Sequence, residues 1–224
     1  IPLNADDSGL PVTILSLTIE NKSVSAANVT LTGWLENKSS IYSANSEEYF
    51  RINEASRNEG LSGVMGSASS YNWVDETFDH AGDYGNVFLA SFTSATKVNT
   101  DAAPDLTPSF FDGENTERKK IEQRNAIASV GNTISLAPGA KAELNYAIAW
   151  YFPNLSFELL KKEGGRYYAN QFKSSLEVAA YVQKNFERLS TATKTWCATW
   201  CHQNTLPYSL RERSFLNISA LATI

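Results

Sequence analysis

The sequence predicts a mainly β protein with α-helices at its C-terminal end, and the β part is expected to be an antiparallel sandwich. The observations behind this are alternating apolar residues in the first 152 positions, a Pro-Gly turn between two such runs, and helical spacing after residue 164. Several short strands separated by turn residues favour a sandwich over a barrel. The 224 residues, 42% of them hydrophobic, can build one large domain or two small ones.

Residues 10–36 predict two strands. Apolar side chains alternate with Ser and Thr in both, at Leu15, Leu17, Ile19, Val29, Leu31 and Leu35. The segment 21–27 between them is small and polar, which is typical of a loop joining antiparallel neighbours.

The central part of the chain shows a weaker pattern. Residues 37–86 are rich in Ser, Asn and Gly and are expected to be irregular, whereas 87–92 forms a compact strand candidate. Residues 93–124 again resemble loops, and the mixed charges of 114–124 indicate a solvated surface segment.

The clearest hairpin signal covers residues 127–136 and 141–152. The turn between them is Ala137-Pro138-Gly139-Ala140, in which Pro presets φ and Gly accepts a positive φ, as a type II turn requires. One face of the second strand carries the large apolar side chains of Leu144, Tyr146, Ile148, Trp150 and Phe152. That face is predicted to lie in the core.

Helical spacing begins after Gly164-Gly165. Apolar or aromatic residues recur every three or four positions over 172–200, which predicts one long helix with an apolar stripe. The stripe includes Phe172, Leu176, Ala179, Val182, Phe186, Leu189, Trp196 and Trp200. Pro207 ends this helix or opens the next element, and a second helical pattern starts near Ser209.

The charge of the chain restricts its partners. A formal net charge of −5 argues against a nucleic-acid or anionic-membrane partner, and no apolar run approaches the roughly 20 residues of a membrane span. The first residues show no signal peptide, and the last ones lie in an apolar helical pattern, so the chain is expected to be a piece of a longer protein. Abundant Asn, Ser, Thr and Tyr with few Lys lean toward an extracytoplasmic location.

No catalytic motif is evident. His80 and His202 lie in unrelated contexts, and no Gly-X-Ser-X-Gly, HExxH, CxxC or Walker pattern occurs. The scattered carboxylates cannot be paired for glycosidase chemistry. Cys197, Cys201 and His202 suggest a metal site but lack a fourth ligand, so buried thiols are the simpler interpretation. The sequence therefore predicts no cofactor, metal or catalytic residue.

One segment, 71–84, has the composition of a binding site. Tyr71, Trp73 and Tyr84 alternate with acids and amides, as in carbohydrate recognition, although the aromatic rings could equally pin a loop to the body. Asp75, Asp79 and Asp83 suggest calcium, but their spacing of four residues fits no EF-hand loop.

Five short motifs, in order, resemble the N-terminal domain of glycoside hydrolase family 116, the β-glucosidases that include the non-lysosomal glucosylceramidases. The first three are a P-x-N-x-x-D-S-x-L-P-V stretch at 2–12, a T-V-E-N-like strand end at 18–21, and an L-x-P-G … A-W-x-F-P-N pattern at 136–139 and 149–154. The other two are a Y-x-x-x-F pattern at 168–172 and an S-x-L-P-like pattern at 205–208.

The resemblance implies a β-sandwich over residues 1–160, followed over 161–224 by a linker helix and the first helical segment of an (α/α)6 catalytic barrel. It implies retaining hydrolysis of β-glucosides by a Glu nucleophile and an Asp acid/base that lie beyond Ile224. The chain itself would be non-catalytic, bracing its own downstream barrel and shaping one side of its cleft. The expected interdomain residues are Phe172, Phe186, Trp196 and Trp200.

Two other functions remain open at this point. One is a carbohydrate-binding module that uses Trp73, Tyr71 and Tyr84. The other is a structural or oligomerisation domain whose helix mediates self-association.

Overall fold

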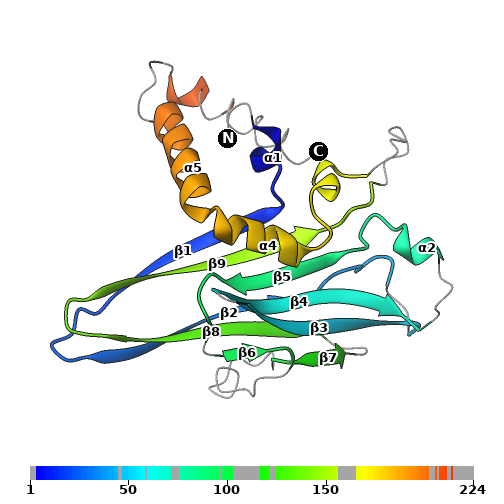
Figure 1. Cartoon of the computed structure of the whole chain (residues 1–224), viewed down its shortest axis with the longest axis horizontal. Coiled ribbons are helices and arrows are strands. Elements are labelled where there is room, and N and C mark those ends of the chain that lie inside the picture. The colour runs from blue at the N-terminus through cyan, green and yellow to red at the C-terminus, as the bar shows by residue number, and fades with distance from the viewer. Residues whose placement is uncertain are drawn as a thin grey trace.

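The computed structural model describes residues 4–44, 47–58, 60–71, 76–95, 97–102, 117–121, 125–155, 165–201, 205, 207–210 and 213. These residues form two antiparallel β-sheets packed face to face, with helices on the outer side of the larger sheet (Figure 1). The predicted mainly antiparallel β fold with C-terminal helices is therefore confirmed at this level.

The larger sheet has the strand order β1-β9-β5-β4-β3-β7, and the smaller has the order β2-β8-β6. The larger sheet contains β1 (Val12–Glu20), β3 (Tyr49–Asn58), β4 (Leu61–Ser70), β5 (Asn86–Ser91), β7 (Arg118–Ile121) and β9 (Lys141–Tyr151). The smaller contains β2 (Ala27–Glu36), β6 (Lys97–Asn99) and β8 (Ile127–Leu136). The helices are α1 (Ala5–Ser8), α2 (Glu76–Asp79), the 3-10 helix η1 (Tyr167–Asn170), α4 (Ser175–Lys184) and α5 (Phe186–Cys201).

Two predicted strand pairings are wrong, although the strands themselves exist. The strands β1 and β2 were expected to pair, but β1 pairs with β9 and β2 pairs with β8, in different sheets. For the same reason β8 and β9 do not form a hairpin. The turn between them is nevertheless the expected type II turn, with φ of 74° at Gly139 and a 3.0 Å hydrogen bond from Ala140 N to Ala137 O. Both connections thus cross from one sheet to the other.

The expected irregularity of residues 37–86 is also wrong in part. The strands β3 and β4 pair along their whole length, from Tyr49 opposite Ser70 to Asn58 opposite Leu61, and β4 also pairs with β5. The strand β4 carries few large side chains, and its Gly63 lies where an added Cβ would be 2.3 Å from the Leu89 carbonyl oxygen. Close packing against β5 therefore requires glycine there, and this hid the strand from the apolar pattern. Short strands β6 and β7 likewise occur within the predicted loop 93–124.

The core of the sandwich lies between the two sheets. It includes the predicted inward face of β9, where Leu144 and Tyr146 are buried and Ile148 packs against them. The other buried members are Val64, Leu89, Val98, Ala128 and Val130. This cluster accounts for the alternation of apolar residues in the strands.

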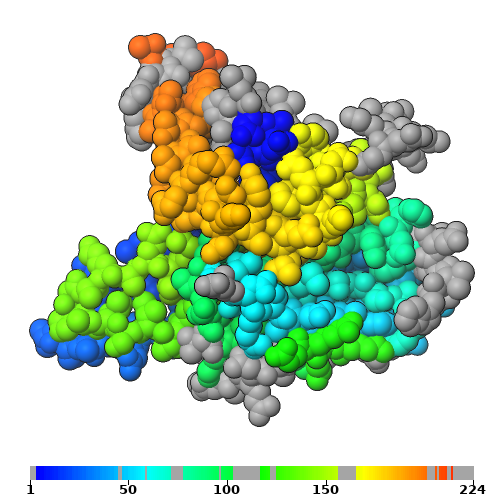
Figure 2. Space-filling view, viewed as in Figure 1, coloured from blue at the N-terminus to red at the C-terminus, as the bar shows by residue number. Residues whose placement is uncertain are grey.

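The opposite face of the larger sheet is covered by helices, which makes a third layer (Figures 1 and 2). The small residues Ala147 and Ala149 of β9 let α4 lie close to the sheet through Val178 and Ala179. Phe172 completes this second core and is 7% exposed. Helix α4 and the segment before it therefore pack on the sandwich as part of its structure. The domain boundary at residue 160 stays a prediction.

The predicted single helix over 172–200 is wrong because the chain bends at Asn185. Ser174 caps the start of α4 by accepting a hydrogen bond from Glu177 N, and α4 ends at Lys184. The Asn185 side chain donates to the Tyr181 carbonyl at 2.8 Å, and Asn185 N donates to the same oxygen at 3.1 Å, so Asn185 closes the last turn of α4. The chain restarts as α5 in a new direction, so the apolar stripe is split between two helices.

Within the described residues, no helix combines the length and hydrophobicity that crossing a membrane requires.

Candidate functional site

A cavity of about 780 Å³ lies where β1 begins and β9 ends. Helices α1 and η1, from the helix layer, and the segments around 38–41 and 82–83 line it. Its lining residues include Leu10, Pro11, Ile41, Trp150, Phe152 and Tyr168. Figure 2 shows α1 and η1 side by side, together with α5, on one side of the sandwich. We call this cavity at the start of β1 and the end of β9 the motif cavity.

Three of the five sequence motifs converge on the motif cavity. Leu10 and Pro11 come from the first motif, Trp150 and Phe152 from the third, and Tyr168 from the fourth. Leu10 and Tyr168 are 158 positions apart in the chain, and no local pattern indicated that these segments meet. Residues from three of the five motifs therefore build one concave surface.

The wall formed by β9 and η1 is fixed by hydrogen bonds. The Tyr168 hydroxyl donates to the Phe152 carbonyl at 2.8 Å, and Arg166 Nη1 donates to the same oxygen at 2.6 Å. Arg166 N donates to the Pro153 carbonyl at 2.9 Å. Gly165 has φ of 67°, and a Cβ there would lie 2.2 Å from the same Pro153 oxygen. Only glycine allows the chain to return this closely to the end of β9.

The opposite wall is fixed through Asp83 and Asn37. The Asp83 carboxylate accepts hydrogen bonds from the backbone N–H groups of Tyr42 and Ser43, at 2.8 and 3.1 Å. Burial alone would raise the pKa of Asp83, but hydrogen bonds from Ser43 and Tyr42 outweigh it, and the pKa is lowered. Asn37, which is 3% exposed, donates from Nδ2 to the carbonyls of Ile52 and Ser67 and so anchors the segment to β3 and β4.

The charged side chains that line the motif cavity already make an ion pair or hydrogen bonds within the domain. Lys38 pairs with Glu36 at 3.2 Å, Arg166 donates to Phe152, and Asp83 accepts from backbone amides. The Tyr167 hydroxyl donates to Asp6 at 2.6 Å, which raises the pKa of Tyr167. What the cavity offers to a ligand is mainly aromatic and aliphatic surface, which suits apolar side chains better than a heavily hydroxylated sugar.

The N-terminal helix α1 is tied to the helix layer by two adjacent acids. Asp6 accepts from Tyr167 and from Gln171 Nε2, the latter at 2.8 Å. The buried Asp7 accepts from Tyr181 of α4 at 2.9 Å and from both terminal nitrogens of Arg188 in α5. The pKa of Asp7 is lowered, chiefly by the hydrogen bond from Arg188. No local pattern in the sequence indicates this connection, because the residues are far apart in the chain.

A family model described as "beta-glucosidase 2, glycosyl-hydrolase family 116 N-term" matches residues 1–189. The chain belongs to this family. A search among curated proteins found no match. The family 116 match includes the sandwich, α1, η1, α4 and the beginning of α5, and so includes every element that lines the motif cavity.

In this family 116 domain, the four expected interdomain residues occupy two different environments. Phe172 is buried in the core between α4 and the larger sheet, and the Phe186 ring packs edge-on against Phe92 with the centroids 5.6 Å apart. Trp196 and Trp200 are half-buried on α5 and contact each other at 5.4 Å. Of the four, the tryptophans are therefore the better candidates for contact with another domain.

The segment 71–84 does not assemble its described aromatic residues into one platform. Tyr71 packs on Phe50 at 4.7 Å, whereas Tyr84 packs on Phe78, which in turn packs on Tyr49. Tyr49 and Phe50 are consecutive in β3, so their side chains point to opposite faces of the sheet. Trp73 and Asp75 lie outside the described residues.

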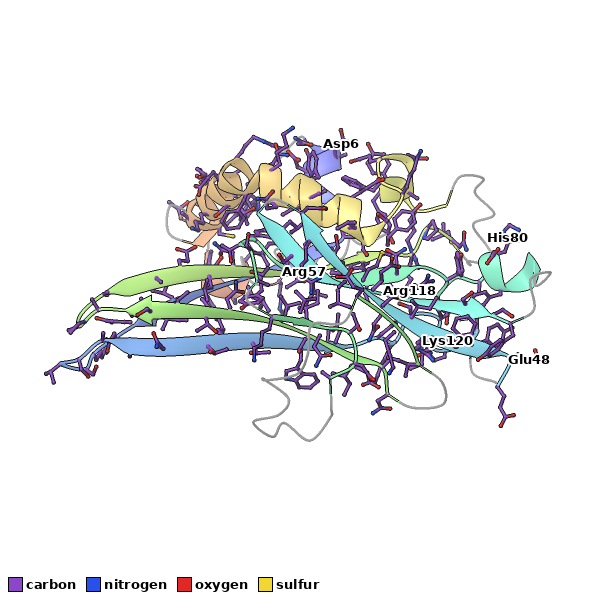
Figure 3. All side chains as sticks on the ribbon, turned by 60° about the horizontal axis from the view of Figure 1, so that its bottom comes forward. Asp6, Glu48, Arg57, His80, Arg118 and Lys120 are labelled. Atoms are coloured by element: carbon purple, nitrogen blue, oxygen red, sulfur yellow. The ribbon has the colours of Figure 1, made fainter. Side chains whose placement is uncertain are left out.

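No described cluster of three His, Cys, Asp or Glu side chains could hold a metal ion. Cys197 is a half-buried free thiol. His202 lies outside the described residues, and the Cys201 side chain is not described either, so the metal interpretation of this segment has no test here. His80 lies on the exposed end of the molecule beside α2 (Figure 3).

Proposed function

We propose that the chain is the non-catalytic N-terminal domain of a retaining β-glucosidase of family 116. In this proposal it braces a downstream helical (α/α)6 catalytic domain and shapes one side of its substrate cleft. The observation that carries the proposal is that residues from three of the five family motifs converge on one mainly apolar cavity whose charged side chains already make hydrogen bonds within the domain.

The motif cavity would accept apolar side chains from the catalytic domain. Its exposed Ile41 and half-buried Trp150 and Phe152 offer a surface that gains free energy when another protein surface covers it. Arg166 and Asp83 already make hydrogen bonds to backbone groups of their own domain, so docking would leave neither side chain without a hydrogen-bond partner.

Helix α5 would serve as the linker to the catalytic domain. It turns away from the sandwich at Asn185, and its direction is fixed by the pairing of Arg188 with Asp7 (Figure 1). Trp196 and Trp200 would then pack against the first helices of the barrel. The proposed division places the sandwich at 1–160 and the linker and first catalytic segment at 161–224.

The test compares hydrolysis of an aryl β-glucoside by the 224-residue chain and by the longer protein that includes the catalytic domain. The chain alone is expected to give no turnover, and the longer protein is expected to be active. In the longer protein, Trp150→Ala should lower activity or thermal stability, because it removes part of the docking surface. Trp34→Ala, on the exposed outer face of β2, is the matched control and should have little effect.

Turnover by the purified chain alone would contradict the proposal. Equal effects of Trp150→Ala and Trp34→Ala would contradict the role of the motif cavity.

A further inference from the structure

The two edge strands of the larger sheet differ in how they are protected against pairing with another chain. Edge strands present unpaired N–H and C=O groups, and natural proteins usually block them with charged side chains. The strand β7 follows this rule with Arg118, Lys119 and Lys120, all exposed (Figure 3). The other edge strand, β1, has no charged residue from Val12 to Ile19.

The strand β1 also exposes apolar side chains. Leu15 is 44% exposed and Leu17 is 42% exposed, although both point toward the space between the sheets, as their partners Tyr146 and Leu144 do. The reason is that the smaller sheet has three strands and faces the middle of the larger one, with β8 packed against β4 and β5. It does not extend far enough to cover β1.

The backbone pairing of β1 shows which residues direct their N–H and C=O groups away from β9 at this edge. Pro11 O accepts from Trp150 N, and Asn21 N donates to Ala140 O, so residues 11 and 21 point toward β9. The pairing between them is continuous, without a bulge. Because backbone direction alternates along a strand, residues 13, 15, 17 and 19 also face β9, and the N–H groups of Ile14, Ser16 and Thr18 face away from the sheet.

We propose that β1 pairs with β1 of a second copy of this chain, antiparallel about a two-fold axis at Ser16. In this register Ser16 lies opposite Ser16 of the second copy, and Ile14 lies opposite Thr18. These outward-facing residues form the new ladder. Leu15 of each copy lies opposite Leu17 of the other, on the uncovered inner face, so each exposed leucine gains an apolar partner.

The sequence of β1 favours a second copy over an unrelated partner. Leu15-Ser16-Leu17 is symmetric, and an isologous contact requires a surface that is complementary to itself. Pairing in this register brings no two charges together: Glu20, whose carboxylate is 3.6 Å from Lys141 Nζ, would lie opposite Val12. A single strand pairing buries less than the roughly 1,200 Å² of stable interfaces, so the dimer is expected to dissociate in the micromolar range.

Sedimentation velocity over a concentration series of the 224-residue chain tests the pairing. We expect a monomer–dimer equilibrium that Ser16→Pro abolishes, because proline removes an N–H that faces the second copy and makes no bond to β9. Ser16→Ala is the matched control: it keeps the N–H, removes the side-chain contact with Asn145, and should still dimerise.

Leu15→Lys gives a second, independent test if Ser16→Pro does not fold. It introduces the charge that β7 carries and β1 lacks, and should raise the dissociation constant by about tenfold or more. Hydrogen exchange adds a residue pattern: protection of the amides of Ile14, Ser16 and Thr18 should rise with protein concentration, while those of Leu15 and Leu17 stay protected throughout.

A chain that stays monomeric at a concentration on the order of 100 µM would overturn the proposal. So would a dimer that is unaffected by both Ser16→Pro and Leu15→Lys. If the longer protein is monomeric and protects the same three amides, its catalytic domain covers β1, and self-pairing is likewise overturned. None of these outcomes depends on whether the chain hydrolyses a glucoside, so this proposal and the proposed function fail separately.

Discussion

Arg188 donates from both terminal nitrogens to the carboxylate of Asp7, although 181 positions separate the two residues. Asp7 belongs to the first family motif, and Arg188 lies in the first turn of α5. The contact joins the beginning of the chain to the helix that would lead to the catalytic domain. One role of the N-terminal motif is therefore to set the direction of α5.

The pairing of Asp7 predicts a dependence of stability on pH. The pKa of Asp7 is lowered in the folded chain, chiefly by the hydrogen bond from Arg188. The ionised Asp7 therefore stabilises the folded chain fully above the unfolded-chain pKa of about 4, and this stabilisation is lost as the pH falls through the folded-state pKa. Asp7→Asn should destabilise the chain by about 1–3 kcal/mol at pH 7, toward the lower end because water screens the half-exposed Arg188.

The measurement is urea unfolding of both proteins between pH 7 and pH 3. The difference in unfolding free energy between the native chain and Asp7→Asn should become smaller as the pH falls. A gap that is constant over this range would show that the charge of Asp7 has no role.

The two environments of the expected interdomain residues predict different substitution effects. Phe172→Ala should cost about 3–5 kcal/mol of unfolding free energy in the chain alone, because the side chain is in the core. Trp196→Ala combined with Trp200→Ala should change the stability of the chain alone much less, but lower the melting temperature of the longer protein. Thermal unfolding of both lengths checks this, and a large loss in the chain alone on replacing the tryptophans would contradict it.

The buried hydroxyl of Tyr146 predicts a second, alkaline limit of stability. It lies 2.7 Å from Asn132 Oδ1 and 2.9 Å from the Leu31 carbonyl, and burial raises the pKa of Tyr146 to about 12. Because the folded-state pKa is raised, the stabilisation is complete below about pH 10 and is lost as the pH rises toward the folded-state value. Tyr146→Phe should cost about 1 kcal/mol at pH 7 and weaken this alkaline dependence. Denaturant unfolding at pH 7 and pH 11 measures both, and an unchanged alkaline dependence would contradict the assignment.

The segment that carries Lys38 and Ile41 of the motif cavity depends on one buried amide. Asn37 Nδ2 donates to Asn53 Oδ1 at 3.1 Å and to two backbone carbonyls. Asn37→Asp places a carboxylate oxygen among these acceptors and should destabilise the chain by about 3 kcal/mol or more. Asn28→Asp, on the exposed face of β2, is the isosteric control and should stay within about 0.5 kcal/mol. Similar unfolding midpoints for the two variants would contradict this role of Asn37.

The sequence predicted the elements whose pattern is local. The alternation around Leu15 and Leu31 and the turn at Gly139 appear as expected. The predicted core face of β9 is confirmed for Leu144, Tyr146 and Ile148, whereas Trp150 and Phe152 line the motif cavity instead. It did not predict which strands pair, because a short connection can cross between sheets as easily as form a hairpin. It missed β4 because Gly63 replaces an apolar side chain where β5 approaches closely.

The candidate site was less accessible from the sequence than the fold. The motifs were visible, but their convergence on one cavity depends on long-range contacts such as Tyr168 with Phe152. The break at Asn185 was also missed, because the apolar periodicity continues through the position where α4 ends and α5 begins. The position of α5 could therefore be obtained only from the structure and not from the sequence.

The most direct measurement of the central claim is hydrogen exchange, followed by mass spectrometry, on the chain alone and within the longer protein. If the motif cavity and α5 meet the catalytic domain, the segments 8–11, 37–44, 165–171 and 196–200 should gain protection in the longer protein, while β8, inside the sandwich, stays unchanged. Equal exchange in these four segments at both lengths would mean that nothing docks there, and the account would be wrong.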